Sequence, residues 1–319
     1  KYDIPFIHTY HTMWEDYVHY ITPIKGRNIY LKRLVRKFSR RFLRKAECVI
    51  TPSNKTAKYL KYKCNVKNKP IYVIPTGIDI KPFSKSNFTL EEKNKLKESL
   101  GIKPEEKVIL FLGRVATEKS IDVIMNVMPS IFNEYSNCKF LIVGDGPSKK
   151  DLQEQAKKLN IQDNVIFTGK VPYNDVPKYY NLGDVFVNAS LTETQGLTFI
   201  EAMAAGIPVV AKYAPNLSEY IKNGKNGILV KRNDDFKNAI IKIFKDEKLT
   251  NSLVTSGYQT AKEYSIEQFG DKLEMLYSEI IKLHNLKKEA QTKEEKNKQK
   301  KTIYKRIREK LLYITRFKK

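Results

Sequence analysis

Short apolar runs alternate with helix-length segments between residues 107 and 230, and this alternation limits the possible folds more than any other feature. Each run is typical of a buried strand. The runs are KVILFLG, KFLIVG, NVIFTG, DVFVNAS, PVVA and GILV. Helices are expected at 119–134, 149–159, 174–181, 197–205, 234–246 and 248–263. This order predicts an α/β fold with a parallel, doubly wound sheet, which binds ligands beyond the carboxyl ends of its strands.

Three domains are predicted along the chain. Residues 1–79 contain expected strands at 4–9, 46–53 and 71–79 and expected helices at 28–45 and 54–62. Pro75 and Gly77 at the exit of the third strand mark a boundary. Residues 80–265 form the second domain, which opens on a helix at 90–100, and residues 266–319 hold a helix near 266–285 and a basic amphipathic tail. With no initiator Met, the chain is expected to lack the first strands of its first domain.

The segment 188–211, NASLTETQGLTFIEAMAAGIPVVA, places two glutamates around a glycine turn. A polar loop with Glu193 leads to Gly196, and a helix from Leu197 through Thr198 carries Glu201. The unpaired amides and positive dipole of such a helix start can hold a phosphate. Carboxylates beside a phosphate site suit sugar hydroxyls, so we expect this segment to bind a nucleotide-sugar.

Polar groups and glycines follow the other strands of the same sheet. Gly113 and Arg114 end one strand, and Lys119 is expected at the next helix start. These two cations can reach one diphosphate, although both can equally be solvated surface groups. Gly144 and Asp145 form a second glycine turn, which permits close approach of a ligand. The TGKV run at 168–171 ends a third strand and can offer backbone groups to a base.

The sequence gives less support to a hydrolase, a metal site or a disulfide framework. Glu193 and Glu201 would lie about 12 Å apart on one helix, whereas a retaining hydrolase pair needs about 5 Å. The four histidines lack metal-ligand spacing, and Cys48, Cys64 and Cys138 lack the spacing of a zinc site or a disulfide framework. We therefore expect no metal and a reducing cytosol. His11, at the end of a strand in the first domain, is either a plain polar residue or a group facing the ligand.

The net charge of +24 is concentrated at the two ends of the chain. Residues 1–75 hold 17 Lys and Arg against 4 Asp and Glu, and residues 287–319 hold 14 against 4. Residues 76–286 are almost balanced, with 28 against 27. The end regions therefore favour an extended anionic partner, either a membrane surface or a nucleic acid.

Two basic segments are also amphipathic. From 25 to 45 there are ten basic residues and no acidic one, with Leu31, Leu34, Val35, Phe38 and Phe42 on one expected stripe. The stripe can pack on the protein core, or it can lie on an anionic bilayer. The tail at 302–319 repeats the pattern, with Ile303, Ile307, Leu311 and Ile314 on one face. A pair of such segments favours the membrane over nucleic acid, for which no binding motif occurs.

The motifs of the second domain, taken together, resemble glycosyltransferase family four. They are GR…EK at 113–119, VGDGP at 143–147, TGKV at 168–171 and TETQGLTFIEAMAAGIPVVA at 192–211. Gln195 departs from the aromatic residue common before this glycine. The run IPFIHTYHTMWEDYVHYI at 4–21 resembles the subgroup that glucosylates diacylglycerol in Gram-positive bacteria.

This resemblance implies a GT-B fold, in which two Rossmann-like domains with parallel sheets face a cleft, the first domain here being truncated at its N-terminus. It implies retaining transfer of a hexose, expected to be glucose from UDP-glucose, to a membrane lipid, expected to be 1,2-diacylglycerol. A soluble sugar or cell-wall glycan is the alternative acceptor. The enzyme is expected to be peripheral, on the cytoplasmic face of the membrane, and to need no cofactor or metal.

The resemblance also implies roles for individual residues. Arg114 and Lys119 would bind the diphosphate, together with the turns at Gly113, Gly144 and Asp145. Glu193 would contact the hexose and Glu201 the ribose, while Val171 would meet the base. The helix start at Gln195, Gly196, Leu197 and Thr198 would touch phosphate or sugar. His11 would lie over the reacting sugar, so His11 and Glu193 are the catalytic candidates, and no nucleophile is assigned.

Overall fold

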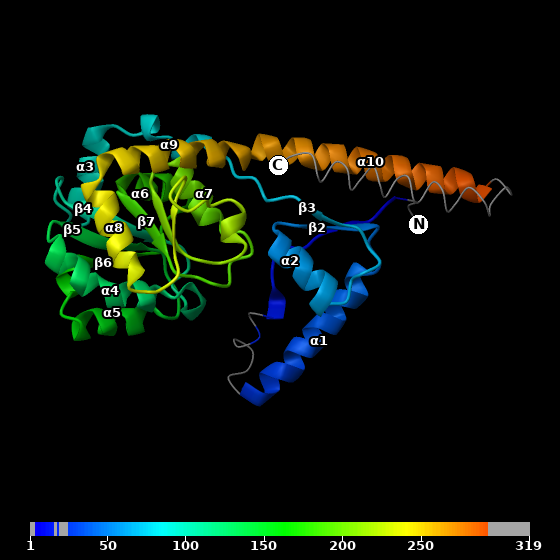
Figure 1. The fold of residues 1–319 in the computed structure, drawn as a ribbon, viewed down its shortest axis with the longest axis horizontal. Coiled ribbons are helices and arrows are strands. Elements are labelled where there is room, and N and C mark those ends of the chain that lie inside the picture. The colour runs from blue at the N-terminus through cyan, green and yellow to red at the C-terminus, as the bar shows by residue number, and fades with distance from the viewer. Residues whose placement is uncertain (1–3, 16–17, 19–24, 293–319) are drawn as a thin grey trace.

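The computed structural model describes residues 4–15, 18 and 25–292 and arranges them as two α/β units (Figure 1). The first unit holds a three-stranded sheet, and the second holds a six-stranded sheet. An extended segment after β3 joins the two units, and the long helix α10 (Ile266–Thr292) runs from the second unit back along the first. Leu276 and Ile280 of α10 pack there on Cys48 and Ile50.

The small sheet is parallel and has the order β1-β2-β3. Its strands are β1 (Ile7–Thr9), β2 (Cys48–Thr51) and β3 (Ile71–Val73). All four residues of β2 are buried, because α1 and the η2 turn cover one face and α10 covers the other. The helices of this unit are α1 (Lys25–Leu43), α2 (Asn54–Lys58) and η2 (Tyr59–Lys63), the last being a π-helical continuation of α2.

The large sheet is also parallel and has the order β6-β5-β4-β7-β8-β9. Its strands are β4 (Lys107–Leu112), β5 (Cys138–Val143), β6 (Val165–Gly169), β7 (Val185–Asn188), β8 (Val209–Lys212) and β9 (Ile228–Val230). The order reverses between β4 and β7, which is the switch point where doubly wound sheets bind ligands. The sequence-based expectation of an α/β fold with a doubly wound parallel sheet is confirmed.

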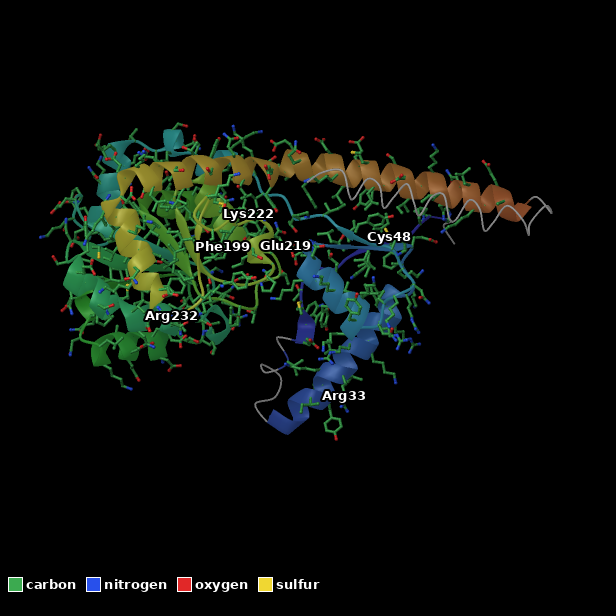
Figure 2. The ribbon with its side chains drawn as sticks, viewed as in Figure 1. Arg33, Cys48, Phe199, Glu219, Lys222 and Arg232 are labelled. Carbon is green, nitrogen blue, oxygen red and sulfur yellow. The ribbon has the colours of Figure 1, made fainter. Side chains whose placement is uncertain are left out.

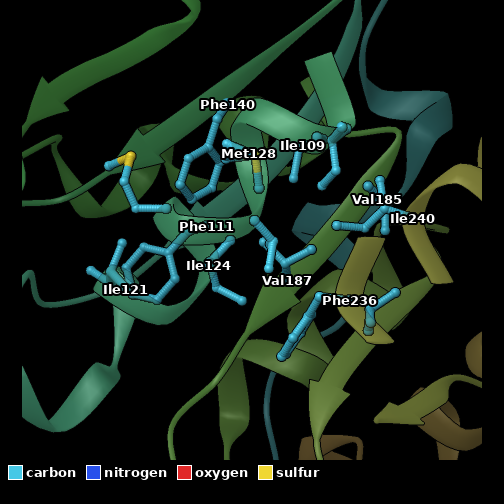
Figure 3. Close-up of a cluster of buried hydrophobic side chains, with 14 of the residues drawn as sticks. Ile109, Phe111, Ile121, Ile124, Met128, Phe140, Val185, Val187, Phe236 and Ile240 are labelled. Atoms are coloured by element: carbon cyan, nitrogen blue, oxygen red, sulfur yellow. The ribbon is translucent and has the colours of Figure 1, made fainter. Parts of the chain in front are cut away.

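Helices cover both faces of the large sheet, and alternation along the strands divides its core in two. In β4, Ile109 and Phe111 face one cluster, whereas Val108, Leu110 and Leu112 face the other. The first cluster is shown in Figure 3, where Phe140, Val185 and Phe236 meet the same group. The helices of this unit are α3 (Leu90–Ser99), α4 (Ile121–Glu134), α5 (Lys149–Lys158), α6 (Val176–Leu182), α7 (Leu197–Ala204), α8 (Asp235–Lys245) and α9 (Glu247–Glu263).

The element positions differ from the sequence-based expectation at two informative places. Lys119 was expected at a helix start, but it ends the short turn η5 (Thr117–Lys119), and α4 begins only at Ile121. Ser120 between them has a left-handed backbone, which breaks the helix. Helix α10 continues to Thr292, beyond the expected end near 285, through residues of good helix propensity. The expected amphipathic tail at 302–319 lies outside the described residues.

Helix α1 presents most of its larger apolar residues outward, so the expected stripe does not pack as a whole on the protein core. Val35, Ser39 and Leu43 recur every four residues; Val35 is half-buried, Ser39 and Leu43 are buried, and Leu43 belongs to the same core cluster as Val49 of β2. Another line, also spaced by four residues, faces away. It consists of Tyr30, Leu34 and Phe38, with exposed fractions of 73%, 61% and 72%, whereas Phe42, next in the same spacing, packs edge-on against Phe6 and His8 beside β1. Arg33, Lys37 and Arg41 are exposed beside it, so one surface is both apolar and basic.

No helix within residues 4–15, 18 and 25–292 is both long and apolar enough to cross a bilayer. The cysteines Cys48, Cys64 and Cys138 are buried and unpaired. Burial raises the pKa of the Cys48 and Cys138 thiols to about 12, so both remain protonated at neutral pH.

The turns after β4 and β5 interlock beyond the ends of the strands. The Gly113 N–H donates to the Val143 carbonyl, and the Val115 N–H donates to the Asp145 carbonyl. Gly144 lies so close that an added Cβ would be 2.0 Å from the Gly113 carbonyl oxygen. Its φ of +131° is also outside the range of ordinary L-residues. Glycine at 144 is therefore required by backbone packing, independently of any ligand.

Replacing Gly144 by Ala should strain this edge of the sheet. We expect a loss of about 3 kcal/mol, from the forbidden φ and the backbone clash together. This corresponds to a fall of roughly 6–12 °C in the midpoint of thermal unfolding. Gly270→Ala is the matched control, because its added Cβ meets nothing within 4 Å in the interior of α10. That variant should be as stable as the parent or more so, by up to about 1 kcal/mol, and an equal loss in both variants would contradict the explanation.

Candidate functional site

The carboxyl edge of the large sheet gathers most of the residues singled out in the sequence. The turn at Gly113 and Arg114 follows β4, the turn at Gly144 and Asp145 follows β5, and the loop 189–196 follows β7. Because β5, β4 and β7 are adjacent and parallel, these three segments emerge side by side. The topology therefore brings together groups that are as many as 80 residues apart in sequence.

The strongest polar contact at this edge is an ion pair between Lys119 and Glu193. The Lys119 Nζ is 2.6 Å from the Glu193 Oε1, and the two side chains are only 22% and 13% exposed. The same loop is fixed through its hydroxyls, because Ser190 and Thr192 both donate to the Glu118 carbonyl, at 3.0 and 3.3 Å. The η5 turn thus holds the loop both by charge and by hydrogen bonds.

Arg114 is the second expected diphosphate ligand, and it also has an acidic neighbour. Its Nη1 lies 3.9 Å from the Glu118 Oε1, and its side chain is about half exposed. Both predicted cations thus stand at the same edge of the sheet, each paired with a carboxylate of the η5 turn or of the loop. A diphosphate arriving here would have to compete with these carboxylates.

Gly196 sets the start of α7. Its φ of +85° is left-handed, and an added Cβ would lie 3.0–3.1 Å from Phe199, Leu217 and Tyr220. Glycine therefore permits a sharp turn directly before the helix. Leu197 and Thr198 occupy the first turn of α7, where backbone N–H groups lack partners within the helix. This geometry fits the predicted contact with a phosphate or a sugar.

Glu201 stands on α7 in a different environment from Glu193. The Tyr180 hydroxyl, on α6, donates to the Glu201 Oε2 at 2.6 Å. Burial raises the pKa of the Glu201 carboxyl, and the hydrogen bond from Tyr180 only partly offsets this effect. One oxygen is occupied by a neutral donor, which leaves Oε1 as the acceptor for a ligand hydroxyl such as that of a ribose.

Gln195 and His11 meet at the segment that joins the two units. The Gln195 amide forms a double hydrogen bond with the Thr76 backbone: its Oε1 accepts from the N–H at 2.8 Å, and its Nε2 donates to the carbonyl at 2.9 Å. Thr76 Oγ1 is also 3.3 Å from His11 Nδ1. Partial burial lowers the pKa of His11, which favours a neutral imidazole. The structure thus gives Gln195 an interdomain contact in addition to its predicted role at the ligand.

The remaining predicted positions have structural explanations of their own. The Asp145 Oδ1 accepts from the Gly146 N–H at 2.8 Å and so shapes its own turn. Val171 is half-buried and packs against the second core cluster. Within the part of the chain that the structure describes, no three His, Cys, Asp or Glu side chains gather closely enough to hold a metal ion.

Four further residues at this edge escaped the sequence analysis. Lys55 and Glu219 link the two units, Tyr180 holds Glu201, and the amide of Asn216 is buried without a hydrogen bond among the described residues. Lys55 and Asn216 had one usable signal, since each follows a strand, β2 or β8, within four residues of its end. Tyr180 had none, because it lies inside a helix and reaches the site only through packing.

Comparison with known proteins was informative over nearly the whole chain. A family model described as "Glycosyl transferases group 1" matches residues 92–260, and one described as "Glycosyltransferase Family 4" matches residues 1–81. Two similar relatives are both alpha-monoglucosyldiacylglycerol synthases. The one from Acholeplasma laidlawii is 33% identical over 89% of this chain and 71% of its own length. The one from Streptococcus pneumoniae is 36% identical over 98% of this chain and 67% of its own length.

Solved structures agree with the fold. The chain superposes on Anabaena Alr3699/HepE, solved in complex with UDP and glucose, with a TM-score of 0.71 and 20% identity. The match covers 86% of this chain and 71% of the other. A sucrose-phosphate synthase from Thermosynechococcus elongatus gives the same TM-score at 24% identity, over 86% of this chain and 67% of the other. The two parallel-sheet units thus have the GT-B arrangement, as the motifs implied.

Replacing Glu201 by Gln should stabilise the protein at neutral pH. The raised pKa means that the folded state disfavours the carboxylate, so stability is lost as pH rises from the unfolded value near 4.5 through the folded value. Glutamine escapes this loss and can still accept from Tyr180. We therefore expect a higher midpoint of thermal unfolding for the variant at pH 7, with the difference vanishing below about pH 4. A difference in unfolding midpoint between variant and parent that is the same at pH 4 and pH 7 would contradict the raised pKa of Glu201.

Proposed function

Since the chain belongs to the group 1 glycosyltransferases of family four, we propose that it transfers a glucosyl group from UDP-glucose to 1,2-diacylglycerol at a membrane surface. Two relatives that share a third of its residues make alpha-monoglucosyldiacylglycerol. The glucose of UDP-glucose is itself α-linked, so formation of an α-linked product corresponds to retention of configuration. The outward face of α1 is the observation on this chain that carries the choice of a lipid acceptor.

On the donor side, we propose that the start of α7 and the cations Arg114 and Lys119 hold the diphosphate. Amides at a helix start and two cations can together balance the charge that grows on the departing UDP. Glu193 would accept hydroxyls of the hexose, and Glu201 would accept the ribose hydroxyl. His11, from the other unit, would lie over the reacting sugar as a neutral imidazole. Because the chain's own cations neutralise the diphosphate, the proposal includes no metal.

The reaction is a substitution at the anomeric carbon of the glucose. The bond between this carbon and the β-phosphate oxygen breaks, and UDP leaves with the bonding electrons. A new bond forms to the free hydroxyl oxygen of diacylglycerol, whose proton is released. The protein must therefore stabilise a developing anion at the diphosphate, which is the task proposed for Lys119 and Arg114.

On the acceptor side, the apolar and basic line on α1 fits a bilayer better than water. Tyr30, Leu34 and Phe38 would insert at the level of the head groups, where a large apolar side chain gains about 1.5–3 kcal/mol on full burial. Arg33, Lys37 and Arg41 would each add about 1 kcal/mol near anionic lipids. Anionic lipids give the cytoplasmic leaflet a negative potential, so we propose peripheral binding on that face through residues 25–45, with residues 302–319 as a second contact.

The activity test uses vesicles that contain diacylglycerol and radiolabelled UDP-glucose. We expect the parent chain to form a labelled monoglucosyl lipid at the same rate with and without EDTA. Lys119→Ala should lose at least about a hundredfold in transfer, the usual effect of removing one charge-stabilising group. Its thermal unfolding should still be cooperative. Folded parent protein that labels no lipid from any UDP-sugar would refute the function, and transfer to a soluble glycan without lipid would assign the alternative acceptor.

The membrane contact can be tested separately from catalysis. The double variant Leu34→Ser, Phe38→Ser removes two exposed side chains and should fold normally. We expect its partition onto phosphatidylglycerol vesicles to fall at least about tenfold, since 1.4 kcal/mol corresponds to a factor of ten. Tyr173→Ser, in the other unit and 84% exposed, serves as the control for loss of an exposed apolar group. Equal binding by both variants would show that α1 does not face the lipid.

A further inference from the structure

Lys55 reaches from the small unit into the loop that carries Glu193. Its Nζ donates to the Leu191 carbonyl at 3.0 Å and to the Glu193 carbonyl at 3.1 Å. These two carbonyls lie on either side of Thr192, so one ammonium group holds the backbone at the point where the Glu193 side chain begins. Lys55 itself lies in the first turn of α2, which follows β2 of the small sheet. The contact therefore crosses from one unit to the other.

Glu219 fixes the part of α2 from which Lys55 extends. Its Oε2 accepts from the Asn54 N–H and from the Asn54 Nδ2, both at 3.1 Å, and its Oε1 accepts from the Lys55 N–H at 3.3 Å. Glu219 stands on the edge of the large unit nearest α2 (Figure 2). A carboxylate at these amides also interacts favourably with the start of a helix. The two units therefore hold each other: Glu219 of the large unit binds the start of α2, and Lys55 of α2 binds the loop of the large unit.

Glu193 is thereby held at two points that come from different units. Lys119 of the large unit binds its carboxylate, and Lys55 of the small unit binds its backbone. Other side chains hold the loop backbone at its two ends, because Asn188 accepts from the Ser190 N–H and Tyr220 donates to the Gln195 and Gly196 carbonyls. Lys55 holds the stretch between them, where Leu191 and Thr192 are exposed. Without Lys55, the loop would still be tied to the η5 turn through Ser190, Thr192 and the Glu193 carboxylate, but the backbone at Glu193 would lose its contact with the small unit.

We propose that Lys55 is a positioning residue that places Glu193 against the hexose, with Glu219 holding Lys55 in place. This inference rests on the proposed donor site. It makes recognition of the sugar depend on contact between the two units, whereas the nucleotide meets groups of the large unit alone. Loss of Lys55 should therefore weaken the binding of UDP-glucose but not that of UDP, which has no hexose.

The experiment compares affinities for UDP-glucose and for UDP by calorimetry on the full chain. Lys55→Met keeps the length of the side chain and removes its donors. We expect its dissociation constant for UDP-glucose to rise at least about fivefold, while that for UDP changes less than about twofold. Lys55→Arg should restore affinity for UDP-glucose, because a guanidinium can donate to both carbonyls. Glu219→Gln should give the same selective loss to a smaller degree, since the amide keeps one acceptor oxygen.

Lys58→Met is the matched control, because Lys58 is exposed on the same helix and its loss changes the net charge equally. We expect it to bind both ligands like the parent. Equal behaviour of the Lys55 and Lys58 variants, or a parallel loss of UDP and UDP-glucose in Lys55→Met, would overturn the inference. A parent chain that binds neither ligand would instead refute the donor site and the proposed function with it.

Discussion

The ion pair between Lys119 and Glu193 is the contact on which the geometry of the candidate site depends. Two groups predicted to serve different ends of a donor neutralise each other across 2.6 Å, in a site that is largely shielded from water. A carboxylate left alone in such a place would be destabilising by several kcal/mol. In the proposed site, a donor would offer both groups a new partner at once, the diphosphate for Lys119 and the sugar hydroxyls for Glu193. UDP alone would satisfy only one of them, so the pair would favour the complete donor over the nucleotide product.

The two units differ in net charge. Residues 76–286 carry almost no net charge, so the cations of the donor edge act locally rather than through a general positive field. Part of the excess of basic residues lies in residues 1–75, where α1 presents it beside an apolar line, and the rest lies in residues 287–319. Helix α10 ties the units together, through Leu276 and Ile280 on the small sheet and through the Lys287–Glu47 ion pair. The proposed lipid-facing surface and the proposed nucleotide site thus lie on different units of one connected body.

The strands and the glycine turns at their carboxyl ends could be predicted because their signals are local. An apolar run followed by a glycine turn places Gly113, Gly144 and Gly196 without any knowledge of distant contacts. The pairing of Lys55 with Glu219 joins residues 164 positions apart, and no periodicity reports such a contact. Helix α1 shows a different limit: spacing predicts its apolar stripe, but a pattern of spacing does not tell how much of that stripe the rest of the chain covers. Gly144 shows a third limit: the nearby Gly113 carbonyl already requires a glycine at this position, so the glycine does not by itself indicate a ligand.

The environments of the two glutamates argue against a paired acid and base. Glu193 lies in a loop against a cation, whereas Glu201 lies on α7 against the neutral hydroxyl of Tyr180, where burial raises its pKa. A general acid must give up its proton to the leaving group, and a diphosphate that already binds two cations has little need of one. A buried carboxyl that accepts from Tyr180 is better suited to hold a hydroxyl in a fixed direction. In the proposed site, Glu201 would thus serve to orient the ligand, and its unfavourable burial would be the stability lost in keeping that acceptor in place.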